Sequence, residues 1–130
     1  MKPKLSILIP VRNEGINLRI MLKILCAIVD VPFEILVIYD SFDDDSIPVV
    51  KKFNKENPII KCVQNKLGKG VLNAVKEGIT QASGDYIFIM AADDIGPVMA
   101  IEDMINLMDK GCELVSKLKE IKEFEKAFGL

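Results

Sequence analysis

Histidine and tryptophan are absent from the sequence, and aromatic residues make up only 6% of its 130 positions. Without histidine, the chain lacks the commonest general base at neutral pH and the commonest metal ligand. A bound metal ion would therefore be held by carboxylates, which favour hard cations such as Mg²⁺ or Mn²⁺. An excess of basic residues is also missing, since the net charge is −2, and this argues against nucleic acid as a partner.

Cysteines are few and isolated. Cys26, Cys62 and Cys112 stand singly, with no CxxC pair, which argues against a zinc site or a redox motif. Because each lies among apolar residues, we expect buried, free thiols in a reducing compartment. No run approaches the ~18 apolar residues of a membrane-spanning helix, and the first apolar stretch is too short for a signal peptide. These features predict a cytoplasmic protein with no transmembrane segment.

What the chain does contain is an alternation of short apolar runs with amphipathic segments. Half of the residues are hydrophobic, as in a globular protein with a core, and the length fits one domain. Strands are expected at 5–9, 34–39, 59–63, 86–90 and 113–116, and helices at 16–29, from 46 to the break at 57–58, at 71–82 and at 97–108. This alternation predicts an α/β fold with three layers, α/β/α, around a mainly parallel sheet.

Several local details of the helices can be predicted. Ser46 is expected to cap the second helix, and Ser83-Gly84 to close the third. The first helix should pack on the core through isoleucines spaced four apart, with leucines widening the stripe. These isoleucines are Ile16, Ile20, Ile24 and Ile28.

Polar residues follow three of the expected strands. In parallel sheets ligands bind beyond the carboxyl ends of the strands. The first strand runs into Pro10-Val11-Arg12-Asn13-Glu14, the second into Asp40, and the fourth into Ala91-Ala92-Asp93-Asp94. We therefore expect the functional residues at this edge of the sheet.

Asp40 has two interpretations that its position alone does not separate. A carboxylate beyond an apolar strand can accept a hydrogen bond from a ligand amide or imino N–H in a partly dry cleft. Equally, an aspartate here can begin a turn and bond backbone N–H groups. The acidic run that follows, 43–45, is interpreted as a solvated turn that favours the positive end of the next helix.

Asp93 and Asp94 also have two interpretations. Adjacent carboxylates can coordinate a divalent cation that bridges ligand phosphates, or they can simply flank the next helix. The loop Gly68-Lys69-Gly70 matches neither a Walker loop nor a dinucleotide fingerprint. Lys69 can still screen a phosphate as a point charge, although a plain turn before a helix is the simpler role.

The combination of these features, in this order, resembles the family 2 glycosyltransferases with the GT-A fold, including the dolichyl-phosphate mannosyltransferase-like branch. The matching segments are LSILIPVRNEG, EILVIYDSFDDDS, NKLGKGVLNAVKEGITQASGDYIFIMAADD and the helix after Pro97. They cover residues 4–116. The chain is therefore divided into a nucleotide-sugar-binding domain at 1–116 and a charged C-terminal helix at 117–130.

The resemblance implies binding of a nucleotide diphosphate sugar, UDP- or GDP-linked, with Mn²⁺ or Mg²⁺, for transfer of the sugar to an acceptor. It implies that the base and ribose lie near Pro10, Arg12 and Glu14, with Asp40 on the base. The family's D-x-D metal element falls on Ala91-Ala92-Asp93. The remaining implied residues are Lys69 and Ala92 as substrate-binding positions and Asp93 and Asp94 as metal ligands.

Three positions depart from the family pattern. Arg12 stands where an aromatic residue often stacks on the base, Tyr39 replaces the first aspartate of a D-D pair, and Ala91 replaces the first aspartate of D-x-D. No residue is identified as the catalytic base, and the acceptor-binding half of the family's enzymes is not recognised. The resemblance thus implies a truncated GT-A domain whose acceptor is unknown.

Alternative functions remain open at this stage. One is a catalytically inactive module that associates with other proteins, or forms a homo-oligomer, through apolar surface left uncovered where the acceptor half is missing. The face of Phe124 and Phe128 in the C-terminal helix could cover that surface. Peripheral association with a membrane also stays open. A receiver-like signalling domain is disfavoured, because Pro10-Val11-Arg12 and Gln64-Asn65 occupy the positions where such a domain needs acidic residues.

Overall fold

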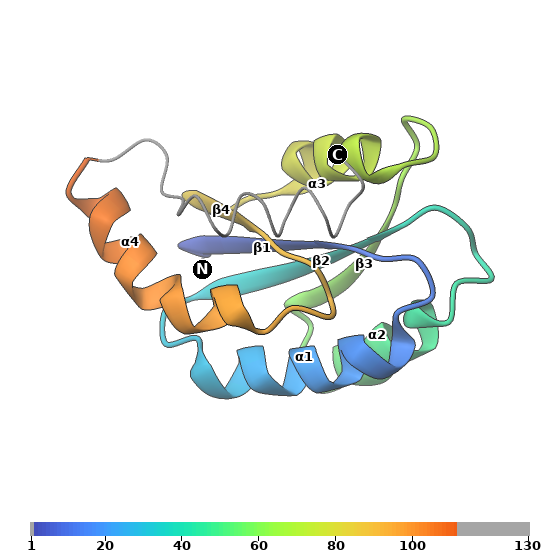
Figure 1. Cartoon of the computed structure of the whole chain (residues 1–130), viewed down its shortest axis with the longest axis horizontal. Coiled ribbons are helices and arrows are strands. Elements are labelled where there is room, and N and C mark those ends of the chain that lie inside the picture. The colour runs from blue at the N-terminus through green and yellow to red at the C-terminus, as the bar shows by residue number, and fades with distance from the viewer. Residues whose placement is uncertain (1, 112–130) are drawn as a thin grey trace.

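Four parallel strands form a sheet in the order β3-β2-β1-β4 (Figure 1). The computed structural model describes residues 2–111, so the expected strand at 113–116, the helix at 117–130 and Cys112 lie outside the described residues. Within residues 2–111, no helix is long and apolar enough to cross a membrane. The elements are β1 (Leu5–Pro10), α1 (Gly15–Ile28), β2 (Phe33–Tyr39), α2 (Ser46–Asn54), β3 (Ile60–Gln64), α3 (Val71–Gln81), β4 (Tyr86–Ile89), the 3₁₀ helix η1 (Gly96–Ala100) and α4 (Ile101–Asp109).

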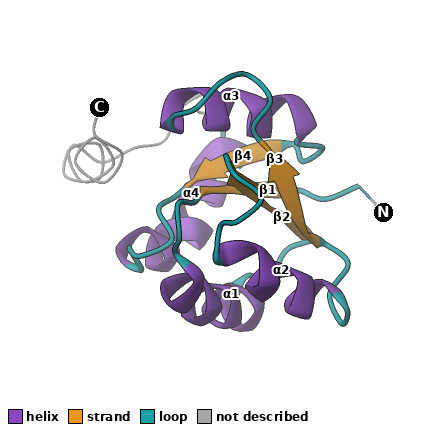
Figure 2. Cartoon of the chain, turned by 90° about the vertical axis from the view of Figure 1, so that its right-hand side faces the viewer, coloured by secondary structure: helices purple, strands orange, loops and turns teal. Residues whose placement is uncertain are grey.

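The helices form layers on both faces of the sheet, as the sequence predicts. Figure 2 shows α3 on one side and α1 and α2 on the other. Alternate strand residues divide between the two cores: Ile7 and Ile35 pack with α1, α2 and α4, whereas Leu8 and Ile38 pack with α3. Both faces of the central strands are buried, which explains why these strands are continuously apolar.

The buried face of α1 differs from the predicted one. Ile16 is 83% exposed and Ile20 is 51% exposed. A spacing of four residues drifts by about 40° per step around an α-helix, so a long run of such positions leaves the core-facing side. The residues that face the core follow the i, i+3, i+4, i+7 pattern instead. They are Leu18, Met21, Leu22 and Leu25.

The expectation of buried thiols is wrong for Cys26, which lies exposed on α1 one residue beyond Leu25. Cys62 on β3 is half-buried. Its burial disfavours the charged thiolate and raises the pKa of Cys62 to about 11. Both are free cysteines.

Gly84 has a different role from the predicted helix cap. The C-cap of α3 is Ala82, in an extended conformation, and Gly84 lies against the start of β1. A Cβ atom at this position would be 2.6 Å from the Ser6 Oγ and 2.7 Å from the Ser6 backbone nitrogen. The glycine is therefore required by the close approach of two chain segments, which the local sequence does not reveal.

Reciprocal hydrogen bonds, here called the loop clasp, join the loop after β1 to the loop after β2. Asn13, whose φ is +52°, donates its N–H to Asp44 Oδ2 over 3.1 Å, and its own Oδ1 accepts from the Asp45 N–H over 3.1 Å. Gly15 N–H donates to Asp45 Oδ1 and Glu14 N–H to the Ser46 Oγ. The clasp fixes where the first loop leaves the sheet.

The loop clasp corrects two predictions about the acidic turn. Asp44 is only 6% exposed, and its two oxygens accept from Asn13 N–H and Ser46 N–H, so it is a structural carboxylate rather than part of a solvated turn. Ser46 is the first residue of α2 and not its cap, because its hydroxyl oxygen is used by Glu14. Asp43 is exposed, as expected.

A second polar cluster lies at the opposite, amino edge of the sheet. Glu34 is 5% exposed, and its Oε2 accepts from the Ser6 hydroxyl over 2.6 Å and from the Ser83 N–H over 2.7 Å. Burial alone raises the pKa of Glu34, but the hydrogen bonds from Ser6 and Ser83 and the charge of Lys61 outweigh it, and the pKa is lowered below its ordinary 4.5. The cluster ties β2 to β1 and to the end of α3.

Replacing Glu34 by glutamine is expected to lower the free energy of unfolding by about 2 kcal/mol at neutral pH, since charge-assisted hydrogen bonds are lost. Because folding lowers this pKa, the carboxylate stabilises the fold fully above its unfolded pKa, and this contribution is lost as the pH falls through the folded pKa. Urea unfolding over a pH series should show the Glu34→Gln deficit shrinking in acid. A deficit independent of pH, or one shared by the exposed Glu56→Gln, would contradict this.

The Asp44→Ala variant is expected to lose about 2 kcal/mol of stability, because the Asn13 and Ser46 N–H groups lose their acceptor. Asp43→Ala is the matched control, since that neighbouring carboxylate is exposed and, among residues 2–111, accepts a hydrogen bond only from the Ser41 hydroxyl; it should change stability by less than about 0.5 kcal/mol. Chemical denaturation of both variants tests the comparison. Equal effects would mean that the loop clasp contributes nothing.

Candidate functional site

A cleft of about 750 Å³ opens at the carboxyl edge of the sheet. The loops after β1, β2, β3 and β4 contribute to its walls. Seven of the eight residues singled out from the sequence line it: Pro10, Arg12, Glu14, Asp40, Lys69, Ala92 and Asp93. Segments that are far apart in the chain thus meet at the edge where parallel sheets bind ligands.

Asp40 lies between the cleft and the glycine-rich loop. Its Oδ1 accepts a hydrogen bond of 2.7 Å from the Asn65 amide, and its Oδ2 accepts one of 3.3 Å from the Gly70 N–H. Asp40 thus bonds a backbone N–H, as one interpretation expects, and it also lines the cleft, while its role toward a ligand stays a prediction.

Asn65 is the main residue that the sequence analysis missed. It directly follows β3, is 8% exposed, and its amide donates to Asp40 Oδ1 and to the Gly68 carbonyl, both over 2.7 Å. Its Oδ1 accepts from the Leu67 N–H. An asparagine just before a glycine-rich turn often bonds the backbone in this way, so the position was a recognisable signal.

The loop after β1 contributes two charged side chains to the cleft, Arg12 and Glu14. Arg12 is exposed, and Glu14 Oε2 accepts from the Asn17 amide over 2.9 Å. Asn13 and Asp44 of the loop clasp also line the cleft, although the sequence analysis did not select them. The loop clasp therefore holds the first loop at the wall of the cleft, which Arg12 and Glu14 also line.

The segment after β4 separates Asp93 from Asp94. Asp93 is exposed and lines the cleft, whereas Asp94 does not line it and its Oδ1 accepts from the Gly96 N–H over 3.0 Å. Ala92 is only 3% exposed and packs in the core beside the cleft. Among residues 2–111, no three potential metal ligands cluster closely enough to hold a metal ion by themselves.

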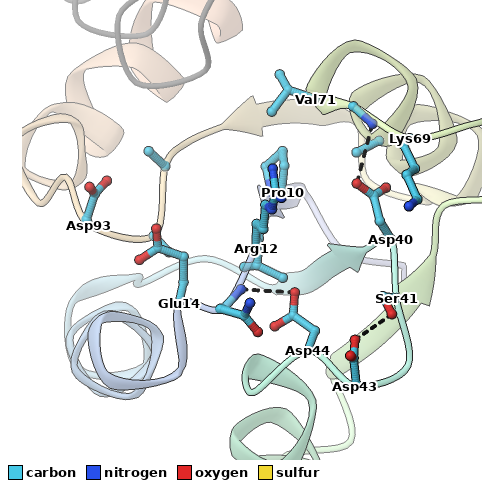
Figure 3. Close-up of a pocket in the computed structure, with 16 residues that line it drawn as sticks. Pro10, Arg12, Glu14, Asp40, Ser41, Asp43, Asp44, Lys69, Val71 and Asp93 are labelled. Carbon is cyan, nitrogen blue, oxygen red and sulfur yellow. Dashed lines mark hydrogen bonds between the residues drawn. The ribbon is translucent and has the colours of Figure 1, made fainter.

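Charges are distributed unevenly along the cleft. Figure 3 shows Asp93 and Glu14 on one side and Asp40 and Lys69 on the other, with Pro10 and Arg12 between them. The cleft is lined by five carboxylates against two cationic side chains, a formal charge of −3. An anionic ligand would be repelled by this surface unless a cation entered with it. The carboxylates are Glu14, Asp40, Asp43, Asp44 and Asp93.

Comparisons with known sequences agree with this arrangement. The model of the family described as glycosyl transferase family 2 matches residues 6–123. A probable glycosyltransferase, YdaM, of Bacillus subtilis is 32% identical over 92% of this chain and 30% of its own length. The dolichol-phosphate mannosyltransferase of Pyrococcus furiosus is 28% identical over 92% of this chain and 34% of its own length. The chain thus spans about a third of the length of these curated relatives.

Solved structures share the fold. The mannosyltransferase PcManGT from Pyrobaculum calidifontis, in complex with GDP-Man and Mn²⁺, aligns with a TM-score of 0.60 at 20% identity, over 72% of this chain and 28% of its own. Glucosyl-3-phosphoglycerate synthase from Mycobacterium tuberculosis, in complex with UDP, aligns with a TM-score of 0.66 at 17% identity, over 85% and 41% respectively. The fold is therefore of the GT-A type, as expected, and with the family match over most of its length the chain belongs to glycosyl transferase family 2.

Proposed function

We propose that this chain binds the nucleotide diphosphate sugar of a glycosyl transfer reaction, together with Mn²⁺ or Mg²⁺. The observation that carries the proposal is the single cleft in which Asp40 and Asp93 lie on opposite sides. A carboxylate at one end suits a base N–H, and a carboxylate at the other suits a cation on the diphosphate. The two related structures with bound nucleotides, one GDP-linked with Mn²⁺ and one UDP, support this assignment.

At the base end, Asp40 would accept a hydrogen bond from the base. Arg12 is exposed beside it in the same cleft, and a guanidinium plane can stack on a base in place of an aromatic ring. Pro10 and Glu14 would border the base and ribose. Lys69 would lie near the phosphates or at the rim of the cleft. These roles follow from the family pattern and from the position of each side chain on the cleft wall.

At the diphosphate end, Asp93 would hold the metal ion. No described residue donates a hydrogen bond to its carboxylate, so its oxygens are available within residues 2–111. One carboxylate fits Mg²⁺ or Mn²⁺ when diphosphate oxygens and water complete the coordination. The charge of −3 in the cleft favours a ligand that brings its own cation. When bound, such a cation stabilises the negative charge of the departing diphosphate. Asp94 stays a prediction as a second metal ligand, because its Oδ1 already accepts a hydrogen bond from the Gly96 N–H.

Association with a second copy of this chain is a second candidate function, and α1 carries the observation that favours it. Ile16 and Ile20 border a shallow depression between α1 and α2, and both are largely exposed. Sedimentation velocity should then give a mass that rises with concentration, and serine substitution of both isoleucines should abolish the rise. Ile59→Ser, on an exposed site elsewhere, is the control. A constant monomer mass for the unaltered chain would refute this function.

Nucleotide binding is tested by thermal unfolding with UDP or GDP, each with and without Mn²⁺. A ligand that binds only the folded state stabilises it by about 2.7 kcal/mol at roughly a hundredfold excess over Kd. We expect a metal-dependent rise in Tm that Asp40→Ala and Asp93→Ala reduce or abolish, while the exposed Glu102→Gln on α4 leaves it unchanged. If both aspartate variants keep the full shift, the site assignment is wrong.

A further inference from the structure

We infer that residues 112–130 of this chain cover an apolar surface formed by α3 and β4, on the face of the sheet opposite α1. This surface, here called the α3–β4 surface, consists of Leu72, Val75 and Ile79 of α3 and Ile87 and Ile89 of β4. None of these five residues lines the cleft. The inference is therefore independent of the proposed function.

The sheet is incompletely covered on the α3 side. Within residues 2–111, α3 is the one helix on this face (Figure 2). It lies over the two central strands, because a Cβ atom at Gly78 would be 2.9 Å from Ile38 of β2 and 3.0 Å from Leu8 of β1. β4 lies beyond β1 at the edge of the sheet. Ile87 of β4 points to the same face as Ile89, two residues on, and is 41% exposed.

One flank of α3 adds to this surface. Leu72 and Ile79 are 57% and 46% exposed. They stand seven residues apart, two turns along the same side of the helix, with Val75 between them. Since Gly78 faces the sheet, a right-handed crossover from β3 to β4 turns this flank toward β4. Apolar side chains of α3 and β4 thus border the same uncovered part of the sheet, where burial from water is favourable.

The end of α4 is held beside the amino end of β4. Lys4, which precedes β1, donates from its Nζ to Asp109 over 2.8 Å, and the hydroxyl of Tyr86, the first residue of β4, donates to the same carboxylate. Gly111, the last residue that the structure describes, follows two positions after Asp109. Residues 112–130 therefore start next to the strand whose α3 side is uncovered.

The length of the segment suits this position. Residues 112–117 can span up to ~20 Å when extended, and layers of secondary structure pack about 10 Å apart. The segment can therefore pass around the edge of β4 from the α4 side to the α3 side. Residues 118–128, as a helix, would then run for about 16 Å, which is close to the ~13 Å of a four-residue strand such as β4.

The sequence of the segment also suits an apolar partner. Leu118, Ile121, Phe124 and Phe128 recur at helical spacing, with lysines and glutamates at most positions between them. Such a stripe is stable as a helix when its apolar side is buried. Because the segment is tethered, it meets the α3–β4 surface of its own chain at an effective concentration on the order of mM. A second copy at lower concentration cannot compete with it.

Limited proteolysis of the full chain tests the inference, because Lys117, Lys119 and Lys122 lie within the segment. Trypsin cuts a packed segment only when it opens, so the cleavage rate reports the open fraction. We expect these sites, followed by mass spectrometry, to be cut at least about tenfold more slowly than in an isolated peptide of residues 112–130. Equal rates overturn the inference.

Variants of both partners should release the segment. Ile79→Gln and Ile87→Thr should each raise the cleavage rate about tenfold, because each removes apolar contact area while suiting its helix or strand. Phe124→Ser should act similarly, and combined with Ile87→Thr it should give less than the product of the two effects, since both disrupt one contact. Ile20→Gln and Ile59→Thr, at exposed positions elsewhere, are the controls and should leave the rate unchanged.

Two further results would overturn the inference. Protection within one chain is the same at every protein concentration, so protection that grows with concentration would assign the α3–β4 surface to a second copy. A response to Ile20→Gln as large as that to Ile79→Gln would mean that the whole fold has loosened. Ile79→Gln, on the surface of a helix, keeps the test valid if Ile87→Thr fails to fold.

Discussion

The loops at the carboxyl edge of the sheet are held by aspartates that follow β2. Asp40 accepts from Asn65 and from Gly70 of the loop after β3, and Asp44 accepts from Asn13 of the loop after β1. Each bond joins residues 25 to 31 positions apart. Without these acceptors the backbone N–H groups of the loops would need water or other partners. The loops after β1 and β3 would also lose their hydrogen bonds to the segment after β2.

The same carboxylates give the cleft its chemical character. A site formally charged −3 is poorly suited to a free diphosphate, and in the proposed function Asp93, opposite Asp40, would be the one protein ligand of the cation among residues 2–111. Metal and nucleotide should therefore bind together, each supplying what the protein alone lacks. In the proposed site, where Ala91 supplies no carboxylate, the phosphates would form a larger part of the metal's coordination than in a site with two aspartates.

Local sequence was a good guide wherever the cause was local. The four strands within residues 2–111 ended within a residue of the expected positions, since continuous apolar runs bounded by proline or acidic residues are typical of buried parallel strands. The local sequence was a poor guide to which residues of α1 face the core, and to the roles of Ser46 and Gly84, which were expected to cap helices. In each case the deciding contact comes from a distant segment: the sheet for Leu18, Glu14 for Ser46, and β1 for Gly84.

The sequence alone determined that this is a parallel α/β domain of glycosyl transferase family 2, with its polar residues after β1, β2 and β4, because periodicity and strand-end motifs are properties of contiguous residues. The tertiary structure decided which of those polar atoms remain available. Asn65 engages one oxygen of Asp40, Gly96 engages Asp94, and Asp93 is left facing the cleft. Hydrogen-bond capacity is shared among neighbours in space, and the sequence does not show who those neighbours are.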